Sequence, residues 1–500
     1  MTKKTRQVAL IILDGWGYRE DVKDNAIKSA HTPVMDRLWE TYPHSLLMAG
    51  EEHVGLPKGQ VGNSEIGHTT IGAGTVIDSD LVRISKAADT GAFNENKAFV
   101  DLFAHVKKHN STLHVLGLIG TGGVHAHSTH LEEFLRSAHA SGLTDIAVHA
   151  FTDGRDSAPH DAEKHIAELE HMLSELGIGY IASVSGRFFS MDRDNNWDRL
   201  ETFEKKALFC EGDVCHLPPT KELQRQYSEG KSDEHIEPFI VKKAPLKKHD
   251  GVFVFNFRAD RVRMLTKRLT DLKSSLDLNV VTLTEYQKGL DVTVAFPELG
   301  IETTLALQVS EAGLSQVHLA ETEKFPHATY FLNGGREEPH DGEEHVVLPS
   351  RKDVKTHDLA PEMRAEGIAD EAIKRIEQGV DFIFINFANT DMVGHTANVP
   401  AIITATQTVD RELGRVLESL SKKGGVAFVT ADHGNAEINI DQKTGEKHTA
   451  HTLSPVPAIV TDTAYVLRDG SLKDIAPTIL TLLGLPVPNA MTGISLVDEK

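Results

Sequence analysis

Short runs of consecutive hydrophobic residues recur along the chain, and polar or glycine-rich turns follow them. Since these runs are hydrophobic at every position rather than at alternate positions, they predict strands that are buried on both faces of a sheet. Amphipathic stretches between the runs predict helices, for example over residues 161–176, 362–378 and 401–421. The predicted strands are Val8–Leu13, Leu113–Ile119, Ile146–Phe151, Tyr180–Val184, Val252–Phe257, Val280–Leu283, Ala328–Leu332, Phe382–Phe387, Val426–Thr430 and Ala458–Val460.

The alternation of strands and helices is typical of an α/β fold with mostly parallel sheets. The chain has 500 residues, and at roughly 100 to 200 residues per domain this length predicts two to four domains. We therefore expect more than one α/β domain.

Charged or metal-ligating residues come shortly after many of the predicted strands. In open α/β sheets, ligands bind outside the carboxyl ends of the strands. A single such residue would carry little weight because turns favour Asp and Gly, but their recurrence predicts an active site at this edge. The residues are Asp14, His125, Arg155, Asp156, Arg187, Arg258, Arg261, Asp391, His395, Asp432 and His433.

Aspartate and histidine dominate this set at the two ends of the chain. Carboxylate and imidazole ligands without thiolates suit Mn²⁺, Zn²⁺ or Mg²⁺. Asp391 and His395 are one helical turn apart, so both can face one ion. His448 and His451 are further candidate ligands. The set is large enough for two ions, which together can stabilise phosphoryl transfer.

Arginines dominate the middle of the chain. A guanidinium group binds phosphate or carboxylate through two parallel hydrogen bonds, so the arginines predict a pocket for an anionic substrate. A candidate nucleophile is Ser64, because Asn63 or Ser64 can cap a helix whose N-terminus would attract a phosphoryl group. The arginines are Arg155, Arg187, Arg193, Arg258 and Arg261.

The composition excludes several classes of protein. With 52 basic and 73 acidic side chains the net charge is −21, which argues against a nucleic-acid-binding protein. Only two cysteines are present, so a disulfide scaffold is excluded. The run Val8–Leu13 is too short for a signal peptide, and no uncharged stretch approaches the roughly 20 residues of a membrane helix. We expect a cytoplasmic protein that binds no membrane.

Taken together, the motifs resemble those of the cofactor-independent phosphoglycerate mutases of the alkaline phosphatase superfamily. The resemblance extends in order over essentially the whole chain, and the arginines distinguish this family from others with the same metal motifs. The matching segments are residues 13–17, 62–68, 122–125, 153–156, 185–187, 191–194, 256–261, 321–324, 386–395, 430–434 and 448–452.

The resemblance implies interconversion of 3-phosphoglycerate and 2-phosphoglycerate by a monomeric enzyme, without 2,3-bisphosphoglycerate. It implies that Ser64 becomes phosphoserine, that Asp156 is an acid and base for the glycerate hydroxyls, and that two divalent ions, typically Mn²⁺, are bound. One ion would be held by Asp391, His395 and His451, and the other by Asp14, Ser64, Asp432 and His433. The implied substrate ligands are His125, Arg155, Asp156, Arg187, Arg193, Arg258, Arg261 and Lys324.

The resemblance also implies the domain organisation. An alkaline-phosphatase-like metal-binding domain would comprise residues 1–78 and 300–500, and a substrate-binding domain would be inserted as residues 79–299. The sequence agrees, since the metal motifs lie at the two ends and the arginines lie in the middle. Two crossings between the domains suggest a hinge.

Two alternative functions remain open. One is a metal-dependent phosphohydrolase or a sugar-phosphate mutase with the same metal ligands. The other is a non-catalytic, metal-stabilised binding protein. A cofactor-dependent mutase is disfavoured because its Arg-His-Gly motif does not occur in the chain.

Overall fold

The computed structural model describes residues 6–298 and 300–500. The chain forms two compact units, and each has its own hydrophobic core. Unit 1 comprises Met1–Asp78 and Gly300–Lys500, and unit 2 comprises Ser79–Leu299. Within the described residues, none of the helices combines the length and the hydrophobicity that a membrane span requires.

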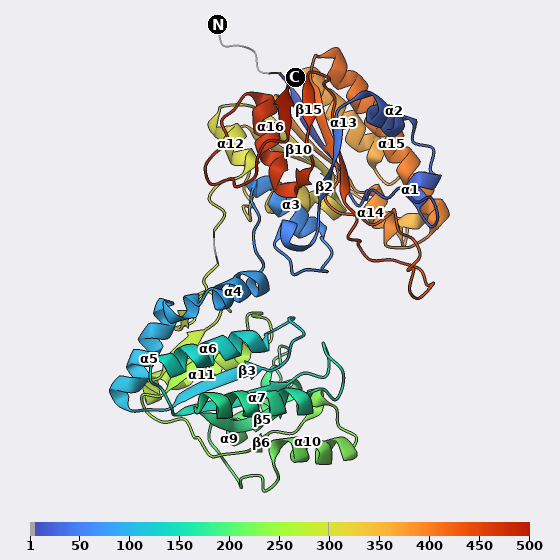
Figure 1. Cartoon of the computed structure of the whole chain (residues 1–500). Helices are drawn as coiled ribbons and strands as arrows, with labels where there is room; N and C mark the ends of the chain where they lie inside the picture. Colours follow the sequence, from blue (N-terminus) through green and yellow to red (C-terminus); the bar gives the residue numbers. More distant parts are fainter. Residues whose placement is uncertain (1–5, 299) are drawn as a thin grey trace. The chain divides into compact units, whose positions relative to one another are not determined.

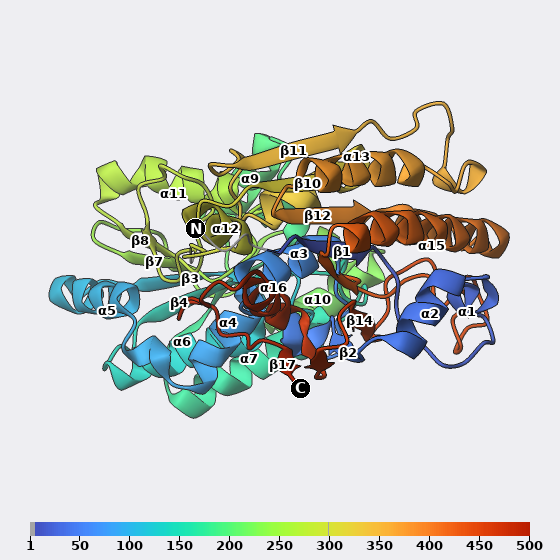
Figure 2. The same cartoon turned by 90° about the horizontal axis from the view of Figure 1, so that it is seen from above.

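Unit 1 is built on an eight-stranded sheet with the order β11-β10-β12-β1-β13-β14-β2-β16, which Figure 2 shows from its β11 edge to β2. Neighbouring strands are parallel except that β14 runs antiparallel to β13 and to β2. The strands are β1 (Val8–Leu13), β2 (His44–Met48), β10 (Gln316–Glu321), β11 (Glu343–Leu348), β12 (Phe382–Phe387), β13 (Val426–Thr430), β14 (Val456–Val460) and β16 (Gly470–Ser471). A small separate sheet pairs β15 (Tyr465–Leu467) with β17 (Val497–Glu499).

Helices cover the sheet of unit 1. In Figure 1, α13 and α15 lie beside each other on one side of the strands, and α12 and α16 lie on the other side. The helices are α1 (Ala26–Ser29), α2 (Pro33–Thr41), α3 (Ser64–Ala73), α12 (Leu305–Glu311), α13 (Ala365–Gln378), α14 (Asn389–Gly394), α15 (Val399–Lys422) and α16 (Ile475–Leu483). Short turns of other helix types are η1 (Glu51–Val54), η4 (Thr322–Lys324), η5 (His327–Phe331), η6 (His357–Leu359) and η7 (Leu472–Asp474).

Unit 2 contains a seven-stranded sheet with the order β6-β5-β4-β3-β7-β8-β9, in which only β6 is antiparallel to its neighbour. The strands are β3 (Leu113–Leu118), β4 (Ile146–Thr152), β5 (Tyr180–Gly186), β6 (Phe239–Ile240), β7 (Gly251–Val254), β8 (Asn279–Thr282) and β9 (Thr293–Val294). The helices are α4 (Asp80–Asp89), η2 (Ala92–Asn94), α5 (Lys97–His109), α6 (Ser128–Ala140), α7 (Ala162–Leu176), α8 (Arg187–Ser190), α9 (Trp197–Ala207), α10 (Pro219–Ser228), η3 (Asp233–His235) and α11 (Arg263–Leu276).

One of the predicted strands is wrong. Residues 328–332 lie in and directly after the π-helical turn η5, which begins after Pro326. Proline has no N–H to donate to a sheet, and its fixed φ suits a helical turn. The other predicted strands are confirmed, and so is the mostly parallel α/β fold, although β7 ends at Val254, earlier than predicted.

Candidate active site

The carboxyl ends of three neighbouring strands bring the predicted aspartates of unit 1 together. β1 lies between β12 and β13, with Leu13 opposite Phe387 and Ile12 opposite Thr430. The residues after these strand ends, Asp14, Asp391 and Asp432, are all buried. Because parallel strands end at the same edge of a sheet, residues far apart in the sequence become neighbours there.

Ser64 is the first residue of α3 and faces this edge. The side chain of Asn63 caps the helix by accepting a hydrogen bond from Ile66 N at 3.0 Å. The Ser64 hydroxyl lies 2.9 Å from His433 Nε2 and 3.4 Å from Asp14 Oδ1. A side-chain oxygen at a helix N-terminus is well placed to carry a phosphoryl group.

Lys324, in the turn η4, places its ammonium group among the same residues. Its Nζ donates to Ser64 Oγ at 2.6 Å, to Asp14 Oδ1 at 2.7 Å and to Asp391 Oδ2 at 2.6 Å. Burial by itself would lower the pKa of Lys324, but the surrounding carboxylates raise it well above its ordinary value. Lys324 is therefore a fixed positive charge beside the Ser64 hydroxyl.

Two groups of side chains in unit 1 have the composition of a divalent-cation site. One is Asp391, His395 and His451, and the other is Asp14, Asp432 and His433. In the first group, His395 Nδ1 donates to Thr449 O at 2.8 Å and His451 Nδ1 donates to Gly62 O at 2.9 Å.

These hydrogen bonds direct the Nε2 atoms of His395 and His451 toward Asp391 Oδ1, at 3.3 Å and 3.2 Å. Backbone carbonyls commonly orient metal-binding histidines in this way. Both groups therefore fit a hard or borderline divalent ion. Of the two candidate histidines near residue 450, His451 belongs to the group and His448 does not.

Neighbouring charges shift the pKa values of the carboxylates in these two groups. Burial and the neighbouring Asp432 raise the pKa of Asp14. Burial would also raise the pKa of Asp391, but Lys324 and the nearby histidines hold it well below its ordinary range. The hydrogen bond to Asp391 raises the pKa of His395. So much negative charge in a buried place favours the binding of cations.

A third cluster, which the sequence interpretation missed, consists of His318, Glu343 and His345 on β10 and β11. His318 Nδ1 donates to Ala328 O at 2.8 Å, so this atom is not free for an ion. Glu343 accepts hydrogen bonds from His345 Nε2 at 2.5 Å and from Asn333 Nδ2 at 2.7 Å. We interpret this cluster as a structural network around a buried carboxylate.

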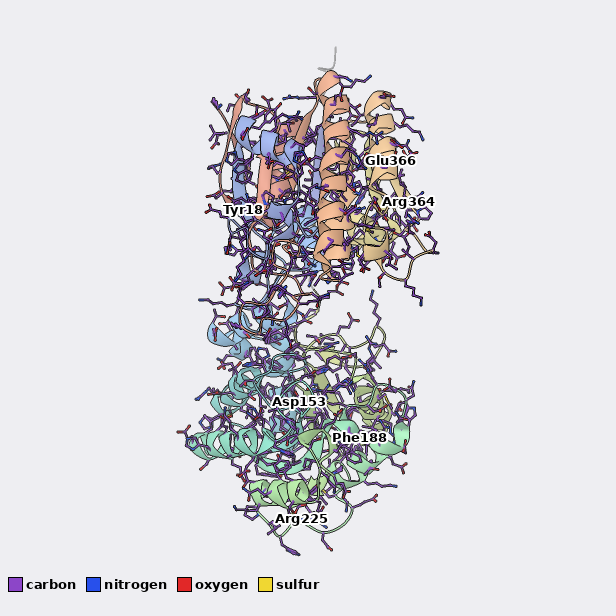
Figure 3. The ribbon with its side chains drawn as sticks, turned by 90° about the vertical axis from the view of Figure 1, so that its right-hand side faces the viewer. Tyr18, Asp153, Phe188, Arg225, Arg364 and Glu366 are labelled. Carbon is purple, nitrogen blue, oxygen red and sulfur yellow. The ribbon has the colours of Figure 1, made fainter. Side chains whose placement is uncertain are left out.

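In unit 2, Arg187 forms the centre of the predicted anion-binding set. It is 1% exposed, and its Nη1 donates to Asp153 Oδ1 and Asp156 Oδ2, both at 2.5 Å. Its Nη2 donates to His125 Nε2 at 2.8 Å, so His125 carries its proton on Nδ1. Asp153, labelled in Figure 3, lies in the matching segment 153–156 but was not among the predicted site residues. Burial and the neighbouring Arg187 lower the pKa of His125 to about 4.

The other arginines lie near Arg187. Burial lowers the pKa of Arg261, and the positive charges of Arg187, Arg193 and Arg155 lower it further, so these side chains form one cationic cluster. Asp260 partly balances the charge: Arg193 Nη1 lies 3.1 Å from its carboxylate, and Arg258 Nε lies 3.2 Å from it. The structure thus gathers the predicted arginines at one place within unit 2.

Comparisons with known proteins agree over the full length of the chain. Residues 6–487 match the model of the Metalloenzyme superfamily. A relative from Synechococcus elongatus is 44% identical over 98% of this chain and 95% of its own length, and one from Clostridium botulinum is 43% identical over 99% of this chain and 100% of its own. Both are named 2,3-bisphosphoglycerate-independent phosphoglycerate mutase.

A similar solved structure is a Leishmania mexicana phosphoglycerate mutase, determined at low cobalt concentration. It is 28% identical, with a TM-score of 0.59 over 99% of this chain and 98% of that one.

Proposed function

Because this chain belongs to the 2,3-bisphosphoglycerate-independent phosphoglycerate mutases of the metalloenzyme superfamily, we propose that it interconverts 3-phosphoglycerate and 2-phosphoglycerate through a phosphoserine at Ser64. One observation carries this proposal: the Ser64 hydroxyl lies within hydrogen-bond distance of Lys324 Nζ and His433 Nε2. A serine that contacts both a fixed cation and a candidate metal ligand is suited to accept a phosphoryl group.

In the proposed reaction, the Ser64 oxygen forms a bond to phosphorus while the bond from phosphorus to the glycerate 3-oxygen breaks. The serine loses its proton and the leaving oxygen gains one. Lys324 and the N-terminal N–H groups of α3 stabilise the negative charge on the transferred group. The reverse transfer to the glycerate 2-oxygen gives 2-phosphoglycerate. We assign the proton exchange with the glycerate hydroxyls to Asp156.

We propose that this enzyme binds two divalent ions, most simply Mn²⁺. Asp391, His395 and His451 would hold one ion, and Asp14, Ser64, Asp432 and His433 would hold the other. When bound, the ions supply Lewis acidity that lowers the pKa of the serine hydroxyl and neutralises phosphoryl charge. The donor atoms present, carboxylate oxygens and imidazole nitrogens, support this assignment.

We propose that the cationic cluster of unit 2 binds the phosphate and the carboxylate of the substrate. Arg187 also fixes Asp156 and His125 through its hydrogen bonds, so it acts partly by orienting these two residues. The other arginines of the proposed set have side chains that are at least partly exposed and so are available to an anion: Arg155, Arg193, Arg258 and Arg261. Lys324 of unit 1 is buried and donates to Ser64, Asp14 and Asp391, so we propose that it contacts only the phosphoryl group at Ser64.

We further propose that the enzyme acts in the cytoplasm as a monomer without a nucleic-acid partner. A net charge of −21 supports the last point. Light scattering during size-exclusion chromatography would test the oligomeric state.

The decisive experiment uses metal-stripped protein, 3-phosphoglycerate and no 2,3-bisphosphoglycerate. Mn²⁺ is added back, and 2-phosphoglycerate and free phosphate are followed together for the wild type and for Ser64→Ala. Ser29→Ala, an exposed serine of the same unit, is the matched control. We expect Mn²⁺-dependent 2-phosphoglycerate in the wild type and in Ser29→Ala, and none in Ser64→Ala. Free phosphate without isomerisation would instead indicate a phosphohydrolase.

A further inference from the structure

Two buried polar side chains, His68 and Asn386, lie behind the proposed metal ligands Asp14 and Asp432. Both are 0% exposed. His68 is one helical turn after Ser64 on α3, and Asn386 lies on β12 opposite Ile12 of β1. Both lie in segments that carry the family resemblance, but the sequence assigned neither a role, and neither takes part in the reaction proposed above.

The hydrogen bonds of His68 define which of its nitrogens carries the proton. Its Nδ1 lies 2.8 Å from the carbonyl oxygen of Ser64 and 3.4 Å from Asp432 Oδ2. A carbonyl and a carboxylate can only accept, so Nδ1 carries a proton. The Nε2 atom lies 3.1 Å from Asn386 Nδ2. Since an amide nitrogen only donates, Nε2 accepts this hydrogen bond.

Asn386 connects His68 to the carboxylate of Asp14 by hydrogen bonds. One proton of its amide group points to His68 Nε2, and the other is donated to Asp14 Oδ2 at 2.8 Å. Asp14 Oδ1 is thereby directed to the opposite side, where it accepts from Lys324 Nζ at 2.7 Å. The amide therefore determines which oxygen of Asp14 faces the active site.

Helix α3 also packs directly against the end of β13. A Cβ atom added to Gly67 would lie 2.9 Å from the carbonyl oxygen of Asp432, so only glycine fits this contact. The ring of Phe384 packs edge-on against the His68 ring, with centroids 5.9 Å apart. His68 is thus held both by its hydrogen bonds and by close packing.

We propose that His68 and Asn386 are positioning residues that fix Asp14 and Asp432, two like-charged carboxylates, in the arrangement that one divalent ion requires. This inference rests on the proposed function, because it assigns the ion to the group of Asp14, Asp432 and His433. It predicts that His68 and Asn386 control the affinity of that ion and leave the group of Asp391, His395 and His451 unaffected. Residues that orient metal ligands commonly contribute about 10- to 100-fold to metal affinity.

The test measures Mn²⁺ binding to the full chain without substrate, by following free Mn²⁺ with electron paramagnetic resonance. Asp432→Asn and His395→Ala identify which binding step belongs to which group. One Mn²⁺-binding step is abolished by Asp432→Asn. We expect Asn386→Ala and His68→Ala to reduce the Mn²⁺ affinity of that step by about 10- to 100-fold. The other binding step is abolished by His395→Ala. In Asn386→Ala and His68→Ala we expect its Mn²⁺ affinity to stay within about twofold of the wild-type value.

A rescue and a matched control separate positioning from general loss of structure. His68→Asn should recover part of the affinity, because its amide can replace the Nδ1 donor. His318→Asn is the control: His318 is buried and also contacts Phe384, at 5.5 Å between ring centroids, but belongs to neither proposed group. It should leave both binding steps unchanged. Circular dichroism checks that each variant folds. If an alanine variant does not fold, the Mn²⁺ affinities of His68→Asn and Asn386→Ser test the inference in its place.

Unchanged Mn²⁺ affinities in the His68 and Asn386 variants would overturn the inference, and so would an equal loss at both steps. If the wild type showed no binding step sensitive to Asp432→Asn, the metal assignment of the proposed function would itself be wrong, and the inference with it.

Discussion

Glu321, at the end of β10, is a buried carboxyl group next to the turn that carries Lys324. It is 1% exposed. Its carboxylate accepts one hydrogen bond from Arg364 N at 2.8 Å and another from Ser350 Oγ at 3.1 Å. Figure 3 labels Arg364 near the start of α13. Burial outweighs these hydrogen bonds and raises the pKa of Glu321 from 4.5 to about 7. Below about pH 7 the folded protein therefore keeps the Glu321 carboxyl group protonated.

The raised pKa predicts how stability depends on pH. A group whose folded-state pKa is raised contributes stability that is fully present below its unfolded pKa and is lost as pH rises through the folded pKa. For Glu321 the loss extends from pH 4.5 to about pH 7. At about 1.4 kcal/mol per pH unit, it amounts to roughly 3 kcal/mol.

Glu321→Gln should remove this loss, because a glutamine has nearly the same shape and does not ionise. Its oxygen can accept from Arg364 N, and its amide can donate to the Ser350 hydroxyl. We expect the variant to gain at least about 2 kcal/mol in unfolding free energy over the wild type between pH 5 and pH 8.

Urea unfolding in the presence of a chelator would measure this difference. Of the three tryptophans, Trp16 and Trp39 are in unit 1, so a Trp197→Phe background restricts the fluorescence signal to that unit. Glu366→Gln, an exposed carboxyl on α13, is the control and should show no pH-dependent gain. A difference between Glu321→Gln and wild type that is the same at pH 5 and pH 8 would refute the reasoning.

Further predictions concern the active site and its helix. Lys324→Met should slow formation of phosphorylated Ser64 by about 10²- to 10³-fold, since it removes a fixed charge from the transition state; rapid-quench labelling measures it, and an unchanged rate would exclude that role. Asn63→Ala should lower the unfolding free energy by about 1 kcal/mol in urea titrations, whereas Asn63→Ser should not. Arg187→Lys should reduce kcat/KM by at least about tenfold in the coupled mutase assay, because an ammonium cannot span the partners of the guanidinium. Because the pKa of His395 is raised, a proton competes with Mn²⁺ for the imidazole. The Mn²⁺ affinity should therefore increase by about tenfold per pH unit for each proton that the ion displaces. Calorimetry in buffers of different ionisation enthalpy measures the number of protons released.

The local pattern of the sequence was sufficient for nine of the strands and for the candidate ligands that follow them. Runs such as Phe382–Phe387 are hydrophobic at almost every position, as expected for a strand covered on both faces. Several strands escaped prediction, among them β2, β10 and β11. The edge strand β11 is partly exposed and carries charged residues, and β10 is buried but includes Gln316, His318 and Glu321, which interrupt the hydrophobic run. The segment 328–332 misled the prediction because a short hydrophobic run fits a strand and a helical turn equally well.

The sequence by itself determined the α/β architecture and the chemical types of the candidate ligands, because both depend on residues close together in the chain. Only the tertiary structure decided which of them become neighbours. It placed Lys324 against Ser64 and Asn386 behind Asp14. These contacts join segments that are separated by hundreds of residues, and no local pattern records them, because they arise when parallel strands end at one edge of a sheet.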